Sequence, residues 1–403
     1  MSPKFKILKD GDICTPLGFK TNAVNCGIKN DKLDLALIYS IVRANAAAVF
    51  TKNKVKAAPV LIGQKSLKGN TAQAIIVNSG NANCCTGKKG IEDTLKVIAE
   101  TAGVLEIDQA DVIMSSTGVI GKYLPVDKII GSIKQLAAGL EFDKAAKTAK
   151  AMMTTDTFPK QCCVSLKIGQ KTVKIAGVAK GAGMIQPNMA TMLCYITTDA
   201  DIAKNALKKS LKQAADNSFN CISVDGDMST NDTLCVLANG LAGNKQIKTS
   251  EDDFIVFSQA LEYVCRELAL MIVKDAEGAT KVIKVNVESA KNKEQAKAAA
   301  YKIANSLLVK TMIAGENPNW GRVPASIGAS GAEFNEEKLE VYLQGVAVYR
   351  KQTPDTKSRN KLIELLKQDK VDITVKLNSG KACHTVWSND LTKEYVQINT
   401  EYN

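Results

Sequence analysis

The sequence predicts an α/β protein of the layered α+β kind, in which helices pack on mixed sheets. Strand-like runs with buried or alternating apolar residues follow one another with helical runs whose apolar residues recur three or four positions apart. The chain has 403 residues, 45% of them hydrophobic and 23% charged, and can therefore bury a substantial core. We expect one large or two ordinary domains without a solenoid repeat.

In the first half of the chain, short apolar runs bounded by turn residues predict strands, and longer periodic runs predict helices. The expected elements are strands at 74–77 and 111–114, helices at 90–102 and from Pro125 onward, and two strands within 161–178 around the Gly169-Gln170 turn.

The second half repeats this mixture after a Gly-rich loop at 180–190 and an apolar run at 192–196. A long helix is expected to follow the Ser250-x-x-Asp253 capping box. Its apolar stripe consists of Phe257, Leu261, Val264, Cys265, Leu268 and Ile272. The remaining expected elements are strands at 282–287, 339–343 and 371–375 and helices at 294–308 and 358–368. We place one boundary in the Gly-rich loop and another near Thr280.

The bulk composition indicates a cytoplasmic protein without membrane spans. The longest apolar run, 36–50, is interrupted by Arg43 and is too short to cross a bilayer, and the N-terminus lacks a signal-peptide pattern. The eleven cysteines are scattered and are expected to be reduced. The net charge of +12 leaves a nucleic-acid-binding protein as an alternative, although the lysines are dispersed without interleaved aromatics. The positive field would also favour small anionic substrates.

A single histidine, His384, restricts the available chemistry. Zinc sites with several histidines and H-E-x-x-H helices are excluded, and we expect no metal and no cofactor. His384 lies in the alternating, strand-like segment 381–387, where a structural role is expected. If the protein activates a nucleophile, the base is expected to be another group.

The segment KGAGMIQPNMATML at 180–193 is the most informative stretch. It lacks the G-K-[ST] ending of a phosphate-binding loop, which leaves two interpretations. One is an ordinary loop that enters a strand. The other is a chain break between Ala190 and Thr191, because a threonine at a chain start carries an α-amine of pKa roughly 8 that can accept the proton of its own hydroxyl. Flexible glycines before the break would let the chain bend for the cut.

This segment resembles the self-cleavage segment of the ornithine acetyltransferase family, also called glutamate N-acetyltransferases. Further blocks resemble family motifs in the family's order. They are VNSGNAN at 77–83, STGVIG at 116–121, MTTD at 153–156, DGDMSTND at 225–232, EGATK at 277–281 and NPNWGR at 317–322. The resemblance covers the whole chain. On residue type alone, 78–83 and 225–232 are expected to hold loops beside the site.

The resemblance implies an N-terminal-nucleophile-type, self-cleaving acyltransferase. Autoproteolysis would give an α chain, 1–190, and a β chain, 191–403, with a C-terminal subdomain from about 280 to 403. Thr191 would be the nucleophile, and Thr117 and Gly118 would form the oxyanion hole. The implied substrate-binding residues are Thr154, Lys180, Thr191, Glu277 and Asn399. The family usually continues to a Thr or Ser just beyond the position of Asn403, so one substrate contact is expected to be absent here or replaced by the terminal carboxylate.

The implied reaction transfers an acetyl group from N2-acetyl-L-ornithine to L-glutamate by a ping-pong mechanism, as the acetyl-recycling step of arginine biosynthesis. Some family members also take acetyl-CoA as donor, and no residue here decides between the two types. The resemblance further implies an α2β2 assembly. The enzymatic alternative is a related self-processing amidohydrolase or aminopeptidase, which would send the acyl group to water.

Overall fold

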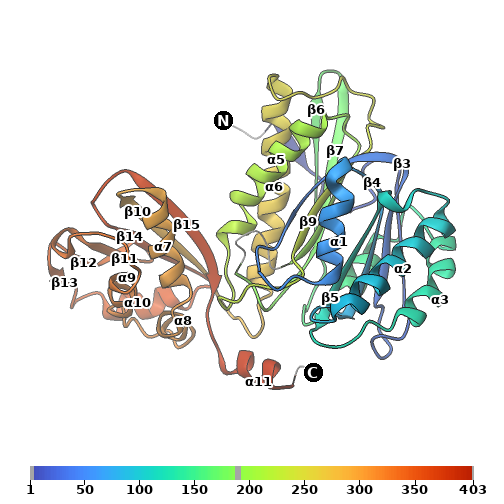
Figure 1. Ribbon diagram of the computed structural model, residues 1–403. Coiled ribbons are helices and arrows are strands. Elements are labelled where there is room, and N and C mark those ends of the chain that lie inside the picture. Colours follow the sequence, from blue (N-terminus) through green and yellow to red (C-terminus); the bar gives the residue numbers. More distant parts are fainter. Residues whose placement is uncertain (1–3, 187–191, 402–403) are drawn as a thin grey trace. The chain divides into compact units, whose positions relative to one another are not determined.

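The computed structural model describes residues 4–186 and 192–401, which form two compact units (Figure 1). Unit 1 comprises residues 4–181, 192–220 and 228–272, and unit 2 comprises residues 182–186, 221–227 and 273–401. Each unit is a sheet covered by helices, which confirms the predicted layered α/β class. Two short segments of unit 2, 182–186 and 221–227, are flanked in sequence by residues of unit 1. No periodicity in the sequence indicates this division.

Unit 1 is built on a mixed sheet whose strands follow the order β1-β6-β7-β8-β9-β3-β4-β5, with β2 paired to β3. Pairs β4–β5 and β8–β9 are parallel, and the other pairs are antiparallel. The bounds are β1 Phe5–Ile7, β2 Phe19–Val24, β3 Leu35–Phe50, β4 Thr71–Asn81, β5 Val112–Val119, β6 Lys160–Ile168, β7 Lys171–Lys180, β8 Leu193–Thr198 and β9 Thr233–Ala238. All expected strands of the first half are present. In addition, the apolar run interrupted by Arg43 forms the long strand β3, whose arginine pairs with Asp111 at 2.8 Å.

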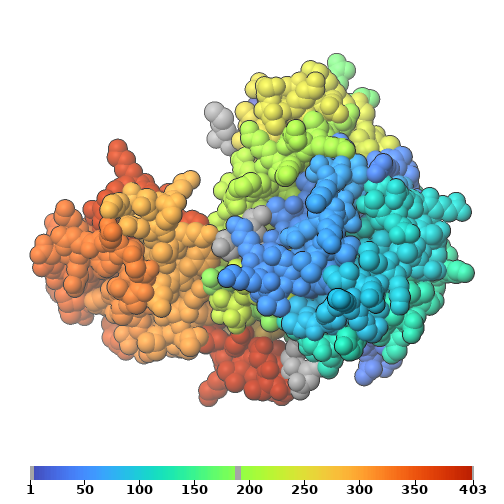
Figure 2. All heavy atoms as spheres, viewed as in Figure 1, coloured from blue at the N-terminus to red at the C-terminus, as the bar shows by residue number. Residues whose placement is uncertain are grey.

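Helices cover both faces of this sheet. Successive residues of its central strands are therefore buried on opposite sides. In β4, Ile75 packs into one hydrophobic cluster with Tyr195, and Ile76 packs into another with Ile129. On the face shown in Figure 2, the segments that carry α1 to α3, coloured blue to teal, and those that carry α5 and α6, coloured green to yellow, form the surface of unit 1. The bounds are α1 Ala58–Ser66, α2 Gly87–Leu105, α3 Val126–Ala138, α4 Ala145–Met152, α5 Lys204–Asp216 and α6 Asp252–Lys274.

Helix α6 has the predicted stripe, since Phe257, Leu261 and Leu268 are fully buried with the other residues expected there. It begins at Asp252, within the expected Ser250-x-x-Asp253 box. The amphipathic period predicted the buried stripe directly.

Unit 2 contains a second mixed sheet in the order β13-β12-β11-β14-β10-β15. Its strands are β10 Val282–Ala290, β11 Glu340–Leu343, β12 Val346–Arg350, β13 Thr353–Pro354, β14 Lys370–Lys376 and β15 Ala382–Asn389, and its helices are α7 Lys293–Ala304, α8 Leu307–Ala314, α9 Arg322–Gly328, α10 Arg359–Leu366 and α11 Lys393–Glu401. The single helix expected at 294–308 is wrong. The helix is interrupted at Asn305 and Ser306. The Ser306 hydroxyl accepts a hydrogen bond from the Val309 N–H and caps the start of α8.

Candidate active site

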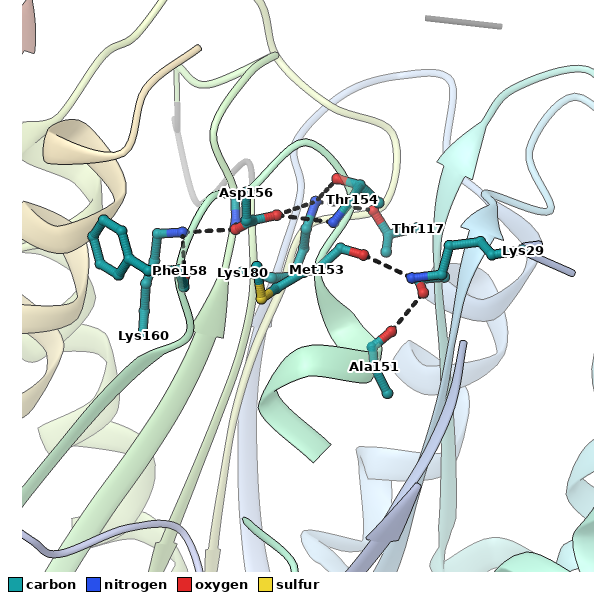
Figure 3. Close-up of polar contacts among 11 residues, drawn as sticks. Lys29, Thr117, Ala151, Met153, Thr154, Asp156, Phe158, Lys160 and Lys180 are labelled. Atoms are coloured by element: carbon teal, nitrogen blue, oxygen red, sulfur yellow. Dashed lines mark hydrogen bonds and ion pairs between the residues drawn. The ribbon is translucent and has the colours of Figure 1, made fainter. Parts of the chain in front are cut away.

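Lys180, the last residue of β7, brings together three of the residues that the sequence singled out (Figure 3). Its ammonium donates to the Thr154 hydroxyl at 2.8 Å and to the Thr117 hydroxyl at 3.4 Å. Thr117 belongs to β5, and Thr154 follows α4, so the three side chains come from distant parts of the sequence. Only 9% of the Lys180 side chain is exposed, so its charge acts in a poorly solvated place.

A buried carboxylate, Asp156, holds this arrangement. It accepts the Thr154 N–H at 3.0 Å and the Gly181 N–H at 2.6 Å, and it lies 3.9 Å from the Lys180 ammonium. It also forms an ion pair of 2.7 Å with Lys160, in which both side chains are fully buried. Burial by itself would raise the pKa of Asp156. The ammonium groups of Lys180 and Lys160 and the Gly181 N–H outweigh this effect and lower the pKa to about 2. Asp156 is therefore ionised at neutral pH and fixes Thr154 and Lys180, two residues of the predicted binding site.

Gly118 lies beside Thr117 where the parallel strands β4 and β5 end, and it is paired with Gly80. Its φ of +135° is a conformation that favours glycine. A β-carbon at this position would lie 2.3 Å from the Gly80 carbonyl carbon and 2.5 Å from the Asn81 nitrogen. Both are backbone atoms, so neither strand can give way without a shift of the sheet.

We expect Gly118→Ala to destabilise unit 1 by roughly 2–4 kcal/mol, because a backbone clash adds to the strain of a positive φ. Thermal unfolding of the purified variant measures the effect. Gly121→Ala is the matched control, since Gly121 also has a positive φ of +85° but a β-carbon there would meet nothing within 4 Å. It should lose only about 1 kcal/mol. Equal losses in the two variants would contradict the role of the close strand approach.

Amides and hydroxyls hold the loops around these strand ends, as the sequence predicted. The Ser116 hydroxyl donates to the Asn78 side chain at 2.6 Å, and the Asn78 amide donates to the Asn81 carbonyl at 2.9 Å. Asn231 donates to the carbonyls of Ala82 and Ser116 at 2.6 and 2.8 Å. The motif at 225–232 is divided, because residues 225–227 belong to unit 2.

Unit 2 brings together the two other predicted binding residues that the structure describes. The Asn399 amide, in α11, donates to the Glu277 carboxylate at 2.8 Å. Glu277 follows α6 and is 8% exposed, and its N–H donates to the Ala182 carbonyl at 3.0 Å. A β-carbon on Gly183 would lie 2.4 Å from this carboxylate, so a larger residue there would require the Glu277 side chain to shift.

The described part of the Gly-rich loop is held by hydrogen bonds, which differs from the flexible segment that its glycines suggested. Asp225 accepts the N–H groups of Met184 and Ile185 at 2.6 and 2.8 Å. Gln186 donates its N–H to the Asp227 carbonyl at 2.8 Å. Lys310, buried in α8, donates to the Val224 carbonyl and supports the same turn. Hydrogen bonds from the backbone N–H groups of residues 184–186 to Asp225 and to the Asp227 carbonyl therefore fix this part of the loop.

Ala190 and Thr191, the predicted cleavage pair, lie outside the described residues. The structure thus gathers Thr117, Thr154 and Lys180 in unit 1 and Glu277 and Asn399 in unit 2. His384 lies in β15, its ring is 6.1 Å from that of Tyr301, and burial lowers its pKa to about 4. It is therefore neutral at pH 7 and packs in the sheet of unit 2. No group of three or more potential metal-binding side chains occurs in the part of the chain that the structure describes.

Three further residues shape the site although no sequence pattern singled them out: Asp156, Lys160 and Asp225. The MTTD block contains Asp156, and its spacing of four residues from Lys160 was visible, but this spacing also occurs on ordinary exposed surfaces. The burial of both charges became evident only in the structure. Asp225 gave no signal beyond a turn-rich composition.

The comparison with known proteins identifies the family. Residues 20–403 match the model of the family described as ArgJ. The chain belongs to the ArgJ family. It is therefore an enzyme, an acyltransferase of arginine biosynthesis. A curated relative from Caldanaerobacter subterraneus subsp. tengcongensis, named arginine biosynthesis bifunctional protein ArgJ, is 47% identical over 98% of this chain and 98% of its own length. The protein of the same name from Bacillus subtilis is 44% identical over 97% of this chain and 96% of its own length.

Two solved structures resemble parts of this ArgJ-family chain. The arginine biosynthesis bifunctional protein ArgJ from Bacillus halodurans is 41% identical, covers 47% of this chain and 100% of the solved chain, and has a TM-score of 0.46. A structure described as ornithine acetyltransferase complexed with ornithine, from Mycobacterium tuberculosis, is 36% identical, covers 46% of this chain and 100% of the solved chain, and has a TM-score of 0.43. No helix in residues 4–186 and 192–401 is both long and apolar enough to cross a membrane.

Proposed function

We propose that this ArgJ-family enzyme cuts itself between Ala190 and Thr191 and then transfers an acetyl group from N2-acetyl-L-ornithine to L-glutamate. The products of the cut are an α chain, 1–190, and a β chain, 191–403, whose new α-amine is the base that the lone, neutral His384 does not provide. In the first half-reaction the Thr191 hydroxyl attacks the acetyl carbonyl, its proton passes to the α-amine, and ornithine leaves with that proton. An acetyl ester remains on Thr191.

In the second half-reaction the amine of glutamate attacks the acetyl ester, and N-acetylglutamate leaves while the Thr191 hydroxyl regains its proton. In both steps the carbonyl oxygen becomes negative and accepts hydrogen bonds from the Thr117 hydroxyl and the Gly118 N–H. Lys180 and Thr154 bind the substrate carboxylate, and Glu277 with Asn399 binds the ammonium group. The transfer needs no cofactor and no metal.

One observation carries this proposal: the Lys180 ammonium contacts both the Thr154 and the Thr117 hydroxyls at the end of β7. A buried cation between two hydroxyls, eleven residues before Thr191 in the sequence, supports a carboxylate site beside an oxyanion site. The names of the curated relatives, arginine biosynthesis bifunctional proteins, support the same pathway.

The cut is tested by mass spectrometry of the purified wild-type protein. We expect two polypeptides that meet at Ala190 and Thr191, and Edman sequencing should yield a chain that starts Thr-Met-Leu-Cys. Active material with only the original N-terminus would overturn the proposed maturation.

The acceptor is tested by supplying N2-acetyl-L-ornithine with and without L-glutamate. A transferase releases ornithine rapidly only when glutamate is present and converts the acetyl group to N-acetylglutamate. A self-processing hydrolase would release acetate at the same rate in both cases, so equal rates would refute the transferase. Acetyl-CoA with glutamate then shows whether this enzyme also uses the thioester donor.

We further propose that the enzyme is cytoplasmic and that two α and two β chains assemble as α2β2. Light scattering of the cleaved protein should give a mass close to twice that of the whole chain, which is 43.2 kDa. A mass equal to that of one chain would refute the assembly.

A further inference from the structure

A pocket of about 380 Å³ opens in unit 1 beside Thr154 and Asp156. Three lysines, Lys29, Lys32 and Lys150, line it together with the Met153–Thr154 backbone region. The volume lies at the small end of the range of roughly 300–1,000 Å³ that is typical of small-molecule sites. The pocket is therefore of a size that suits part of an amino-acid-sized ligand, and its charged lining is entirely cationic apart from Asp156.

Lys29 is placed firmly in this lining. Its ammonium donates to the Met153 carbonyl at 2.9 Å, one residue from Thr154 (Figure 3). The buried Asp34 accepts the N–H groups of Cys26, Ile28 and Lys29 at 2.7, 2.7 and 2.9 Å and so fixes the loop that carries this lysine.

The stem of Lys29 also lies against the end of β4. A β-carbon on Gly80 would come within 3.1 Å of the Lys29 side chain, and Gly80 is the strand partner of Gly118. The Lys29 side chain thus passes next to the predicted oxyanion site before it reaches the Met153–Thr154 region. Lys29 therefore lies in the same part of unit 1 as Gly118 and Thr154.

None of the three lysines forms a salt bridge with a carboxylate in residues 4–186 and 192–401, and Asp156, the acidic residue of the lining, is already paired with Lys160. Burial lowers the pKa of Lys29 to about 8, Asp34 and Asp156 oppose this change, and Lys180 and Lys32 add to it. A half-buried ammonium in a positive surrounding is stabilised when an anion binds next to it.

The proposed reaction supplies a side-chain carboxylate in only one of its two halves. Ornithine and glutamate share the α-carboxylate and the α-amine, but the ornithine side chain ends in a cation and the glutamate side chain ends in a carboxylate. A site that takes both in turn needs a cationic place for the second. Lysines that line a small pocket would favour the carboxylate and repel the ammonium.

We propose that the pocket lined by Lys29, Lys32 and Lys150 is the subsite for the side-chain carboxylate of the acceptor glutamate, with Lys29 as its direct ligand. This inference rests on the proposed acetyl transfer and names the part of the site that selects the acceptor. Lys29 is a specificity residue of the second half-reaction and takes no part in breaking the donor's acetyl amide.

Ping-pong kinetics separate the two halves, because kcat/KM for each substrate reports its own half-reaction. Lys29→Met should lower kcat/KM for L-glutamate about 10–100-fold, the loss expected for one charged hydrogen bond of roughly 1.5–3 kcal/mol. The value for N2-acetyl-L-ornithine should stay within about twofold. Lys29→Arg should restore most of the loss for glutamate, and Lys29→Met should also reduce the preference of the enzyme for glutamate over L-glutamine.

The matched control is Lys128→Met. Lys128 donates to the Gly27 carbonyl of the same loop at 2.8 Å but does not line the pocket, so its variant should keep both values. Lys32→Met, an exposed position, tests the pocket without a risk to folding and should lower kcat/KM for glutamate alone by several-fold.

Three outcomes would overturn the subsite. They are equal losses for both amino-acid substrates in Lys29→Met, unchanged glutamate kinetics in both lysine variants, and a loss confined to acetyl-CoA, which would assign the pocket to the phosphates of the thioester. A wild-type protein that transfers no acetyl group would instead refute the proposed function itself, so the two failures are distinguishable.

Discussion

Thr191→Ala is expected to yield a single uncut chain without measurable acetyl transfer. The substitution removes the hydroxyl that would attack the Ala190 carbonyl during the cut and the acetyl carbonyl during turnover, so both activities are lost together. The expected loss in kcat/KM exceeds about 10⁴-fold, as for the removal of other catalytic nucleophiles. Gel electrophoresis and mass spectrometry report the cut, and the ornithine-release assay reports the turnover.

Thr191→Ser is the matched variant because it keeps a hydroxyl and the future α-amine. It should cut itself, more slowly than the wild type, and retain measurable transfer. If uncut Thr191→Ala protein remained active, the nucleophile would lie elsewhere and the proposed mechanism would be wrong.

Asp156→Asn is expected to produce the second largest effect. The amide keeps the shape but removes the charge that holds Lys180 and Thr154, and it leaves the fully buried Lys160 ammonium without its carboxylate. Loss of one partner of a buried ion pair costs about 3–5 kcal/mol, so the midpoint of thermal unfolding should fall by roughly 5–15 °C. Displacement of Lys180 should lower kcat/KM for both substrates about 10²-fold.

A double variant separates positioning from stability. Asp156→Asn with Lys160→Met removes the buried charge that the Asp156 carboxylate no longer balances, so part of the stability should return. The activity should not return, because Lys180 and Gly181 still lack the Asp156 carboxylate. Asp93→Asn is the matched single control. Asp93 is also buried and paired with a lysine four residues away, Lys89, at 2.9 Å, but it lies in α2 and should leave the kinetics unchanged. Full recovery of activity in the double variant would show that Asp156 acts only on folding.

The acid stability of the protein should also depend on Asp156. The folded-state pKa of about 2 is lower than the ordinary value of 3.8. A depressed carboxyl pKa stabilises the folded state above the ordinary value, and this contribution, about 2 kcal/mol, is lost as the pH falls from about 4 to about 2. The stability difference between wild type and Asp156→Asn should therefore narrow over that interval. A difference that stays constant from pH 5 to pH 2 would contradict the depressed pKa.

Local patterns were sufficient for most of the elements. The α6 stripe, the β6–β7 hairpin around Gly169-Gln170 and the buried strand within β4 are encoded in residues close together in sequence, and periodicity exposes such relations directly. The break between α7 and α8 was missed, because Asn305 and Ser306 interrupt a run that otherwise keeps its helical period.

By itself, the sequence determined the layered α/β class, the single histidine and the motifs that place this chain in the ArgJ family. Only the tertiary structure showed that Thr117, Thr154 and Lys180 meet at the end of β7, that Asp156 is a buried anchor and that Lys29 joins a cationic pocket. These residues come from different strands and loops, and their charges interact strongly because folding removes water from around them. Neither the proximity of residues from different strands nor the burial of their charges produces a periodic pattern in the sequence. Both are evident only in the folded chain.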